Sequence, residues 1–78
     1  MDYDEFQRHL GKAGLKVYEF ARLMEMNPTS ISNKRAVGVP RHLAVIAVLL
    51  GEMVDNGIDY RRAFERLETT PKNHEEQT

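Results

Sequence analysis

The residues from Asn27 to Lys34, NPTSISNK, combine hydrogen-bonding side chains with the signals that begin a helix. Asn27 is a favourable N-cap, because its side-chain oxygen can accept a hydrogen bond from a backbone N–H in the first turn. Pro28 suits the first helical position, where no N–H is needed. Ile31 is the only large apolar side chain, so it can dock the helix on a core. The stretch predicts a short helix over residues 28–34 with an outward face of hydrogen-bond donors and acceptors.

A short polar helix is also a common connector in helical proteins, so its neighbours in the sequence must decide between the two interpretations. Before it, apolar side chains recur at the helical spacing i, i+3, i+4, i+7, at Val17, Phe20, Ala21 and Met24. This pattern predicts a helix over residues 16–24. After it, a loop over residues 35–39 leads to Pro40, which suits the first position of another helix. Residues 43–50 are all apolar and the helix is expected to end near Gly57, so we expect it to be buried on all sides at the centre of the core.

Two further helices flank these three. Asp2, with Glu5 three residues later, resembles a capping arrangement, and apolar residues then recur at helical spacing over residues 3–13. We interpret the acids of this first turn as partners of the helix dipole and not as a metal site or a carboxylate pair. Asp59 can cap a fifth helix, whose apolar stripe is Tyr60, Ala63, Phe64 and Leu67. Residues 69–78 lack apolar side chains and are predicted to be a disordered tail.

Length and composition limit the number of domains, the kinds of cross-link and the cellular location that are expected for this chain. Its 78 residues predict one domain, residues 1–68, with a modest core. The absence of cysteine excludes disulfides and thiolate metal sites, and with no signal-peptide pattern a cytoplasmic location is expected. The longest apolar run, Leu43 to Leu50, is far shorter than the roughly 18 residues that span a bilayer, so a soluble protein without a membrane partner is expected.

Catalysis is not expected. The histidines, His9, His42 and His74, lack the spacing of metal ligands, and no Gly-rich phosphate loop occurs. The serines stand at a helix start without a paired base. The sequence therefore predicts no enzyme, no cofactor, no metal site and no small-molecule substrate.

Charge is distributed unevenly along the chain. The net charge is −1, but residues 8–42 hold seven Lys and Arg against two Glu, a local charge of +5. The segments 1–7 and 43–78 each carry −3. A basic middle between acidic ends is typical of a surface that faces phosphates, although a solvated face produces the same pattern.

The helix order and several short motifs resemble the Cro and lambda-repressor-like family, the XRE family of phage and bacterial transcription regulators. The resemblance covers residues 15–55, and its motifs are FARLM at 20–24, NPTSISN at 27–33, VP at 39–40 and LAVIA at 43–47. It implies an all-α, five-helix domain with a helix-turn-helix at the second and third helices. Two features depart from the family pattern. Glu25 stands where a turn glycine with positive φ is usual, and Lys34 and Arg35 replace an aromatic residue and an acid.

The resemblance implies sequence-specific binding of double-stranded DNA by a small transcription regulator, most simply a repressor, with residues 28–34 in the major groove. By the family's pattern the side chains that read bases are Thr29, Ser32 and Asn33. Those that hold phosphates are Lys16, Tyr18, Asn27, Ser30, Lys34 and Arg35. Each is also open to interpretation as a solvated surface residue, and Tyr18 as a packing residue. The alternative function is a protein-interaction or antitoxin-like module that binds a protein through the fifth helix, which the near-neutral charge favours.

The fifth helix comes after four helices that can already form a complete core. Its apolar stripe can therefore remain partly uncovered within one chain. An exposed apolar strip at the end of a small domain often marks a subunit interface, so we expect a twofold homodimer. The expected interface residues are Met53, Ile58, Tyr60, Phe64 and Leu67. Two recognition helices related by that axis would meet major grooves about 34 Å apart. The alternative is that this helix packs only on its own core.

Overall fold

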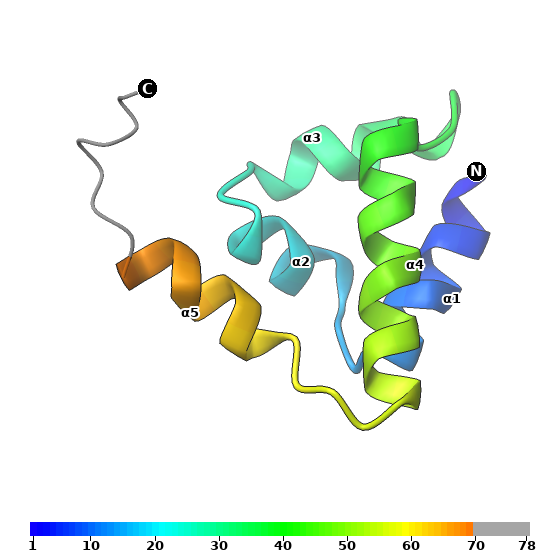
Figure 1. Ribbon diagram of the computed structural model, residues 1–78. Coiled ribbons are helices and arrows are strands. Elements are labelled where there is room, and N and C mark those ends of the chain that lie inside the picture. The colour runs from blue at the N-terminus through cyan, green and yellow to red at the C-terminus, as the bar shows by residue number, and fades with distance from the viewer. Residues whose placement is uncertain (70–78) are drawn as a thin grey trace.

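The computed structural model describes residues 1–69, and Figure 1 shows how their helices are arranged. Five α-helices and one 3-10 helix follow in order: α1 Tyr3–Lys12, α2 Val17–Leu23, α3 Pro28–Ser32, η1 Asn33–Arg35, α4 Arg41–Asp55 and α5 Arg61–Thr69. No strand occurs in these residues, which confirms the prediction of an all-α chain. None of the described helices has the length and apolar character needed to cross a membrane. Apart from Thr69, which ends α5, the tail predicted for residues 69–78 lies outside the described residues.

The core lies among α1, α2, α3 and α4, with α2 and α3 on one side of the packed pair α1 and α4 (Figure 1). Phe6 of α1 and Phe20 of α2 are fully buried and meet edge to face, with ring centroids 5.4 Å apart. Ile31 is also fully buried and fastens α3 to the same cluster, as the sequence predicted. The buried residues of α4 in this cluster are Leu43, Ala47 and Leu50. Residues more than forty positions apart in the sequence therefore share one core.

The helices α1 and α4 approach closely where α4 carries Gly51. A Cβ atom at this position would lie 3.1 Å from the backbone oxygen of His9 and 3.3 Å from the Cβ of Lys12. The Lys12 Nζ reaches across this crossing to Asp55, at 2.9 Å, and to Glu52, at 3.5 Å. The hydrogen bond that Lys12 donates to the Asp55 carboxylate raises the pKa of Lys12 above its usual value. The end of α1 is thus tied to the end of α4 by close packing and by an exposed ion pair.

Three helices end in the same backbone motif, and one of them does so without glycine. At the end of α2, the Met26 N–H donates to the Ala21 carbonyl at 2.8 Å and the Glu25 N–H donates to the Arg22 carbonyl at 3.1 Å. This Schellman motif requires positive φ at Glu25, which has φ 57°. Gly14 and Gly57 hold the equivalent positions after α1 and α4, with φ 77° and 75°. Glu25 therefore adopts the strained conformation that glycine adopts without cost.

The prediction that the fourth helix is buried on all sides is wrong. Although α4 buries one side against α1, its Val45 and Leu49 side chains are 42% and 55% exposed. The reason is that no described element of this short chain packs over the opposite side of α4 (Figure 1). The helix also begins one residue later than predicted, because Pro40 occupies the N-cap position with extended ψ.

Candidate nucleic-acid interface

Local sequence signals position α3 as predicted. The Asn27 Oδ1 accepts a hydrogen bond from the Thr29 N–H at 2.9 Å, and Pro28 is the first helical residue. The buried Ile31 docks the helix, which leaves the polar side chains of Thr29, Ser30 and Ser32 exposed to solvent. The helix is shorter than predicted, because the α-helical hydrogen bonding ends at Ser32 and the chain continues as η1.

The three residues predicted to read bases remain together on this exposed segment. Thr29 and Ser32 lie on α3, and the Ser32 hydroxyl donates to the Thr29 carbonyl at 3.2 Å. In this arrangement the Ser32 oxygen presents its acceptor lone pairs to an incoming ligand. Asn33 follows as the first residue of η1 and is exposed. Its amide offers both a donor and an acceptor just beyond the end of the α-helix.

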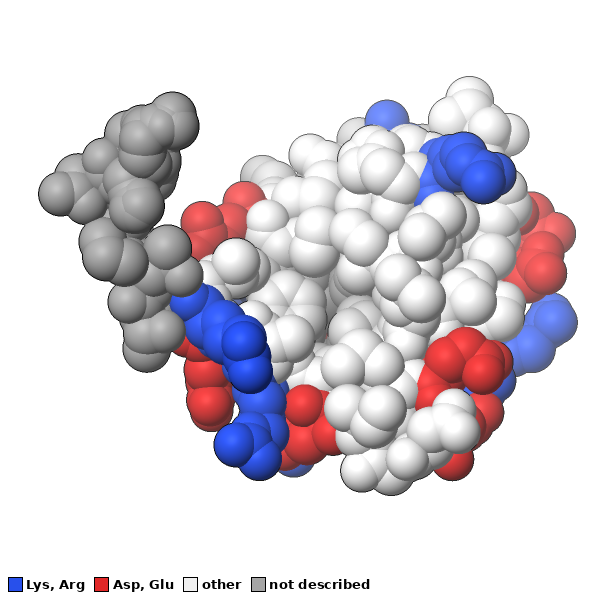
Figure 2. Space-filling view, in the orientation of Figure 1, with Lys and Arg blue, Asp and Glu red and all other residues white. Residues whose placement is uncertain are grey.

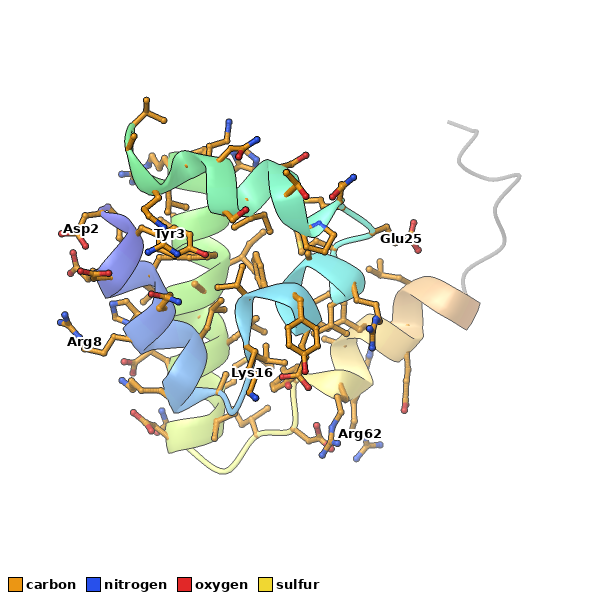
Figure 3. All side chains as sticks on the ribbon, turned by 180° about the vertical axis from the view of Figure 1, so that it is seen from behind. Asp2, Tyr3, Arg8, Lys16, Glu25 and Arg62 are labelled. Atoms are coloured by element: carbon orange, nitrogen blue, oxygen red, sulfur yellow. The ribbon has the colours of Figure 1, made fainter. Side chains whose placement is uncertain are left out.

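A cleft of about 510 Å³ runs between α1, the start of α2 and α3. It brings together four of the predicted DNA-contacting residues, which are Lys16, Tyr18, Thr29 and Ser32. The Lys16 N–H donates to the Glu19 Oε1 at 2.8 Å, which fixes the start of α2 and thereby the position of Lys16 at the cleft (Figure 3). Tyr18 is 49% exposed, and the Arg22 guanidinium lies 5.9 Å from its ring centroid.

The opposite wall of the cleft comes from α1, which the sequence did not connect with this site. Tyr3 and Gln7 line the cleft, and Gln7 is exposed. These residues are four apart, so they lie on the same face of α1. That spacing was visible in the sequence, but which face of α1 meets α3 was not. Gln7 adds an amide to the polar groups around the cleft.

The cationic residues Lys34 and Arg35 lie in η1, beyond the end of α3. The Arg35 guanidinium sits over the Tyr3 ring, 4.5 Å from its centroid, and Lys34 is half-buried. The following loop is held by the first residue of the chain, because the Val39 N–H donates to the Met1 carbonyl at 2.8 Å. One of the predicted phosphate contacts, Arg35, therefore rests on a side chain of α1 and not on α3 itself.

The basic residues of the segment 8–42 do not form one continuous surface. Lys12 pairs with acids of α4, and Arg8 points away from Lys16 on the outer side of α1 (Figure 3). The exposed carboxylate of Glu25 lies in the turn just before α3. Of the residues predicted to hold phosphates, the cations near α3 are Lys16, Lys34 and Arg35. Asn27 and Ser30 are exposed at the start of α3, but they do not line the cleft.

The residues predicted for a subunit interface are exposed to different degrees. Tyr60 is only 9% exposed and meets Phe64 edge to face, so it already packs within its own chain. Met53 and Phe64 are half-buried against the core. Ile58 and Leu67 are 52% and 66% exposed. Most of the apolar area left for a contact through α5 therefore belongs to Ile58 and Leu67.

Comparison with known proteins found no matching family, no matching curated protein and no matching solved structure. The case for a function therefore depends on the residues and geometry of this chain.

Proposed function

We propose that the protein binds double-stranded DNA in a sequence-specific manner, as a small transcription regulator of the lambda-repressor-like kind. The observation that carries this proposal is the exposed polar face of the segment Thr29–Asn33, with Lys16 in the adjoining cleft and Lys34 and Arg35 directly after it in η1. Protein surfaces that read DNA place polar groups against base edges and cations against the phosphates on either side. In this proposal α2, the Glu25 turn and α3 form a helix-turn-helix.

The two groups of side chains have different roles in this mechanism. With α3 in the major groove, the Asn33 amide can bond to both N6 and N7 of an adenine, and the Thr29 methyl can contact a thymine methyl. Ser32 presents its oxygen to a base donor. Lys16, Lys34 and Arg35 neutralise phosphates, which positions the helix without selecting a sequence. A half-site that contains A·T pairs is therefore expected.

The proposal is tested by selecting bound duplexes from a random pool and then measuring the affinity of variants for the selected site. Asn33→Ala is expected to lower specific affinity by about 1 to 3 kcal/mol and to leave binding to random duplexes nearly unchanged. The matched control is Ser30→Ala on the same segment, which should weaken both kinds of binding equally. Equal losses for Asn33→Ala on selected and random duplexes would exclude a base-reading role.

A twofold DNA site requires two copies of the chain, and we propose a homodimer formed through α5. The exposed apolar side chains of Ile58 and Leu67 support this contact. Tyr60 contributes indirectly, because it is buried and holds α5 against the domain.

A second candidate function is a protein-binding module that uses α5. The dispersal of the basic residues favours it, because phosphate binding uses few of them. A salt titration separates the two functions. Binding of duplex DNA through phosphates must give a steep negative slope of log affinity against log salt, whereas apolar docking through α5 gives a shallow one.

A further inference from the structure

The outward side of α4 is an apolar face with opposite charges at its two ends. Between Arg41 and Glu52 the helix contains no Lys, Arg, Asp or Glu. On the outward side Val45 and Leu49 are exposed and Val48 is half-buried. Figure 2 views the molecule from this side and shows a broad uncharged area over α4, with positive charge toward its upper end and negative charge toward its lower end. A contiguous exposed apolar face is typical of a surface that another molecule covers.

The face has the shape and the residue spacing of a helix-packing seam. A groove of about 380 Å³ runs along it, lined on α4 by Arg41, Ala44, Val45, Val48 and Leu49. Arg41, Val45, Val48 and Glu52 follow one another at intervals of four, three and four residues. This alternation keeps side chains in line along one side of a helix and is the spacing of two-stranded coiled-coil contacts.

We propose that this α4 seam, defined as Arg41, Val45, Val48, Leu49 and Glu52, packs antiparallel against the same seam of a second copy of the chain. In the antiparallel register Val45 lies opposite Val48 of the second copy, and Arg41 lies opposite its Glu52. The twofold axis repeats each contact, so two Arg–Glu pairs enclose the apolar centre. A parallel arrangement would instead place Arg41 against Arg41 and Glu52 against Glu52.

Glu52 is available for this contact. Its side chain is 57% exposed, and its Oε2 lies 3.5 Å from the Nζ of Lys12. The shorter contact of Lys12, at 2.9 Å, is to Asp55. Asp55 can therefore hold the α1–α4 crossing while Glu52 pairs with Arg41 of the second copy.

The antiparallel pair has a geometric consequence. Because α3 lies near the Arg41 end of α4, the two α3 segments of the pair lie at opposite ends of the contact (Figure 1). The α4 seam therefore does not present both segments to one twofold site. It would instead join two separate DNA-bound units. This consequence rests on the proposed function, but the contact itself does not.

Charge exchange tests the register. In sedimentation equilibrium, Arg41→Glu and Glu52→Arg should each raise the dimer dissociation constant at least about tenfold. The double variant Arg41→Glu/Glu52→Arg should restore the dissociation constant of the parent chain. All measurements are made in a Leu67→Glu background, so that α5 does not contribute, and thermal melts check that each variant folds. A Leu67→Glu chain that stays monomeric at about 1 mM would overturn the proposal. A double variant that dimerises no more tightly than the single variants would also overturn the proposal.

Disulfide trapping gives an independent test, because the natural chain has no cysteine. The double variant Val45→Cys/Val48→Cys should form a covalent dimer on mild oxidation, through Cys pairs that join the two copies. Val45→Cys alone should form far less, and the control Val54→Cys, on an exposed position outside the seam, should form little. Equal trapping by Val45→Cys alone would indicate a parallel pair and overturn the antiparallel register. A double variant that traps no more than the control would exclude the contact.

Discussion

The Arg35 guanidinium lies 4.5 Å from the centroid of the Tyr3 ring, so a cation that follows α3 rests on the first turn of α1. Tyr3 is only 5% exposed and also lines the cleft beside α3. One side chain of α1 therefore supports the proposed phosphate contact of Arg35 and forms part of the cleft wall. This contact couples the stability of the fold to the position of Arg35.

We predict that Arg35→Ala lowers the free energy of unfolding by about 0.5 to 1 kcal/mol, because it removes a cation–π contact. Lys34→Ala, which removes the neighbouring charge without touching that ring, should have a smaller effect on unfolding. Both variants should reduce the salt slope of duplex binding by about one unit if each cation neutralises a phosphate. Urea unfolding and salt titration measure the two effects separately. An unchanged slope would remove that residue from the interface.

Glu25→Gly should stabilise the protein by about 1 kcal/mol, because glycine adopts positive φ without steric cost. Glu25→Gln serves as the control, since it removes the charge and keeps the strain. Gly14→Ala and Gly57→Ala should destabilise by a similar amount, because an added Cβ at either position meets no atom within 4 Å and only the φ is strained. Thermal unfolding compares all four variants. If Glu25→Gln is as stable as Glu25→Gly, charge and not backbone strain accounts for the effect.

Two glycines in helices should respond oppositely to alanine. Gly51→Ala places a Cβ 3.1 Å from the His9 backbone oxygen, so α1 must shift, and we expect a loss of about 1 to 3 kcal/mol. Gly11→Ala on α1 meets nothing within 4 Å and should stabilise by up to about 1 kcal/mol through helix propensity. Chemical unfolding of both variants provides the measurement. If Gly51→Ala leaves the free energy of unfolding unchanged, α1 and α4 can move apart at no cost in stability.

The start of α5 should depend on pH through Asp59. Its Oδ1 accepts from the Arg61 N–H at 3.0 Å and from the Arg61 Nε at 3.1 Å. The backbone hydrogen bond, followed by the side-chain hydrogen bond, lowers the pKa of the Asp59 carboxyl in the folded state. Its stabilising contribution is therefore present above the unfolded-state pKa, about 4, and is lost as pH falls through the lower folded-state pKa.

The measurement compares wild type with Asp59→Ala by urea unfolding across this range. The difference in stability should be largest near neutral pH and should shrink in acid. A difference that is independent of pH would mean that the carboxylate charge has no part in the cap.

The α5 contact is tested with Leu67→Glu, which places a charge on a side chain that is 66% exposed and should leave the monomer folded. We expect this variant to weaken the dimer that carries two α3 segments on one duplex. Val45→Lys on α4 is the control and should leave that contact intact. Sedimentation equilibrium in the absence of DNA measures both variants in an Arg41→Glu background, so that the α4 seam does not contribute. A wild type that remains monomeric at tens of micromolar would exclude a stable α5 dimer.

Features set by neighbouring residues were predictable from the sequence. The caps at Asp2, Asn27 and Asp59 all accept a backbone N–H within three residues, as expected. The docking of α3 through Ile31 also followed from one apolar residue in a polar stretch. Each of these depends on chemistry within one turn of helix, where sequence spacing and spatial distance agree.

Features set by distant residues were not predictable. An apolar helix is buried only if the rest of the chain supplies enough surface to cover it, and the sequence of α4 does not contain that information. The position of Gln7 on the cleft and of Arg35 over Tyr3 depends on how α1 meets α3. The positive φ of Glu25 was suggested only by resemblance, because glutamate itself has no preference for that conformation.

The packing of α1 against α4 also sets an order for biosynthesis. Phe6 and Leu10 share their buried cluster with Leu43, Ala47 and Leu50, and Lys12 is 40 residues before its partner Glu52. A ribosome therefore releases α1, α2 and α3 before the helix that buries their apolar sides has been synthesised. Because domains fold as units, the nascent segment that contains α3 is expected to gain its shape only after α4 emerges.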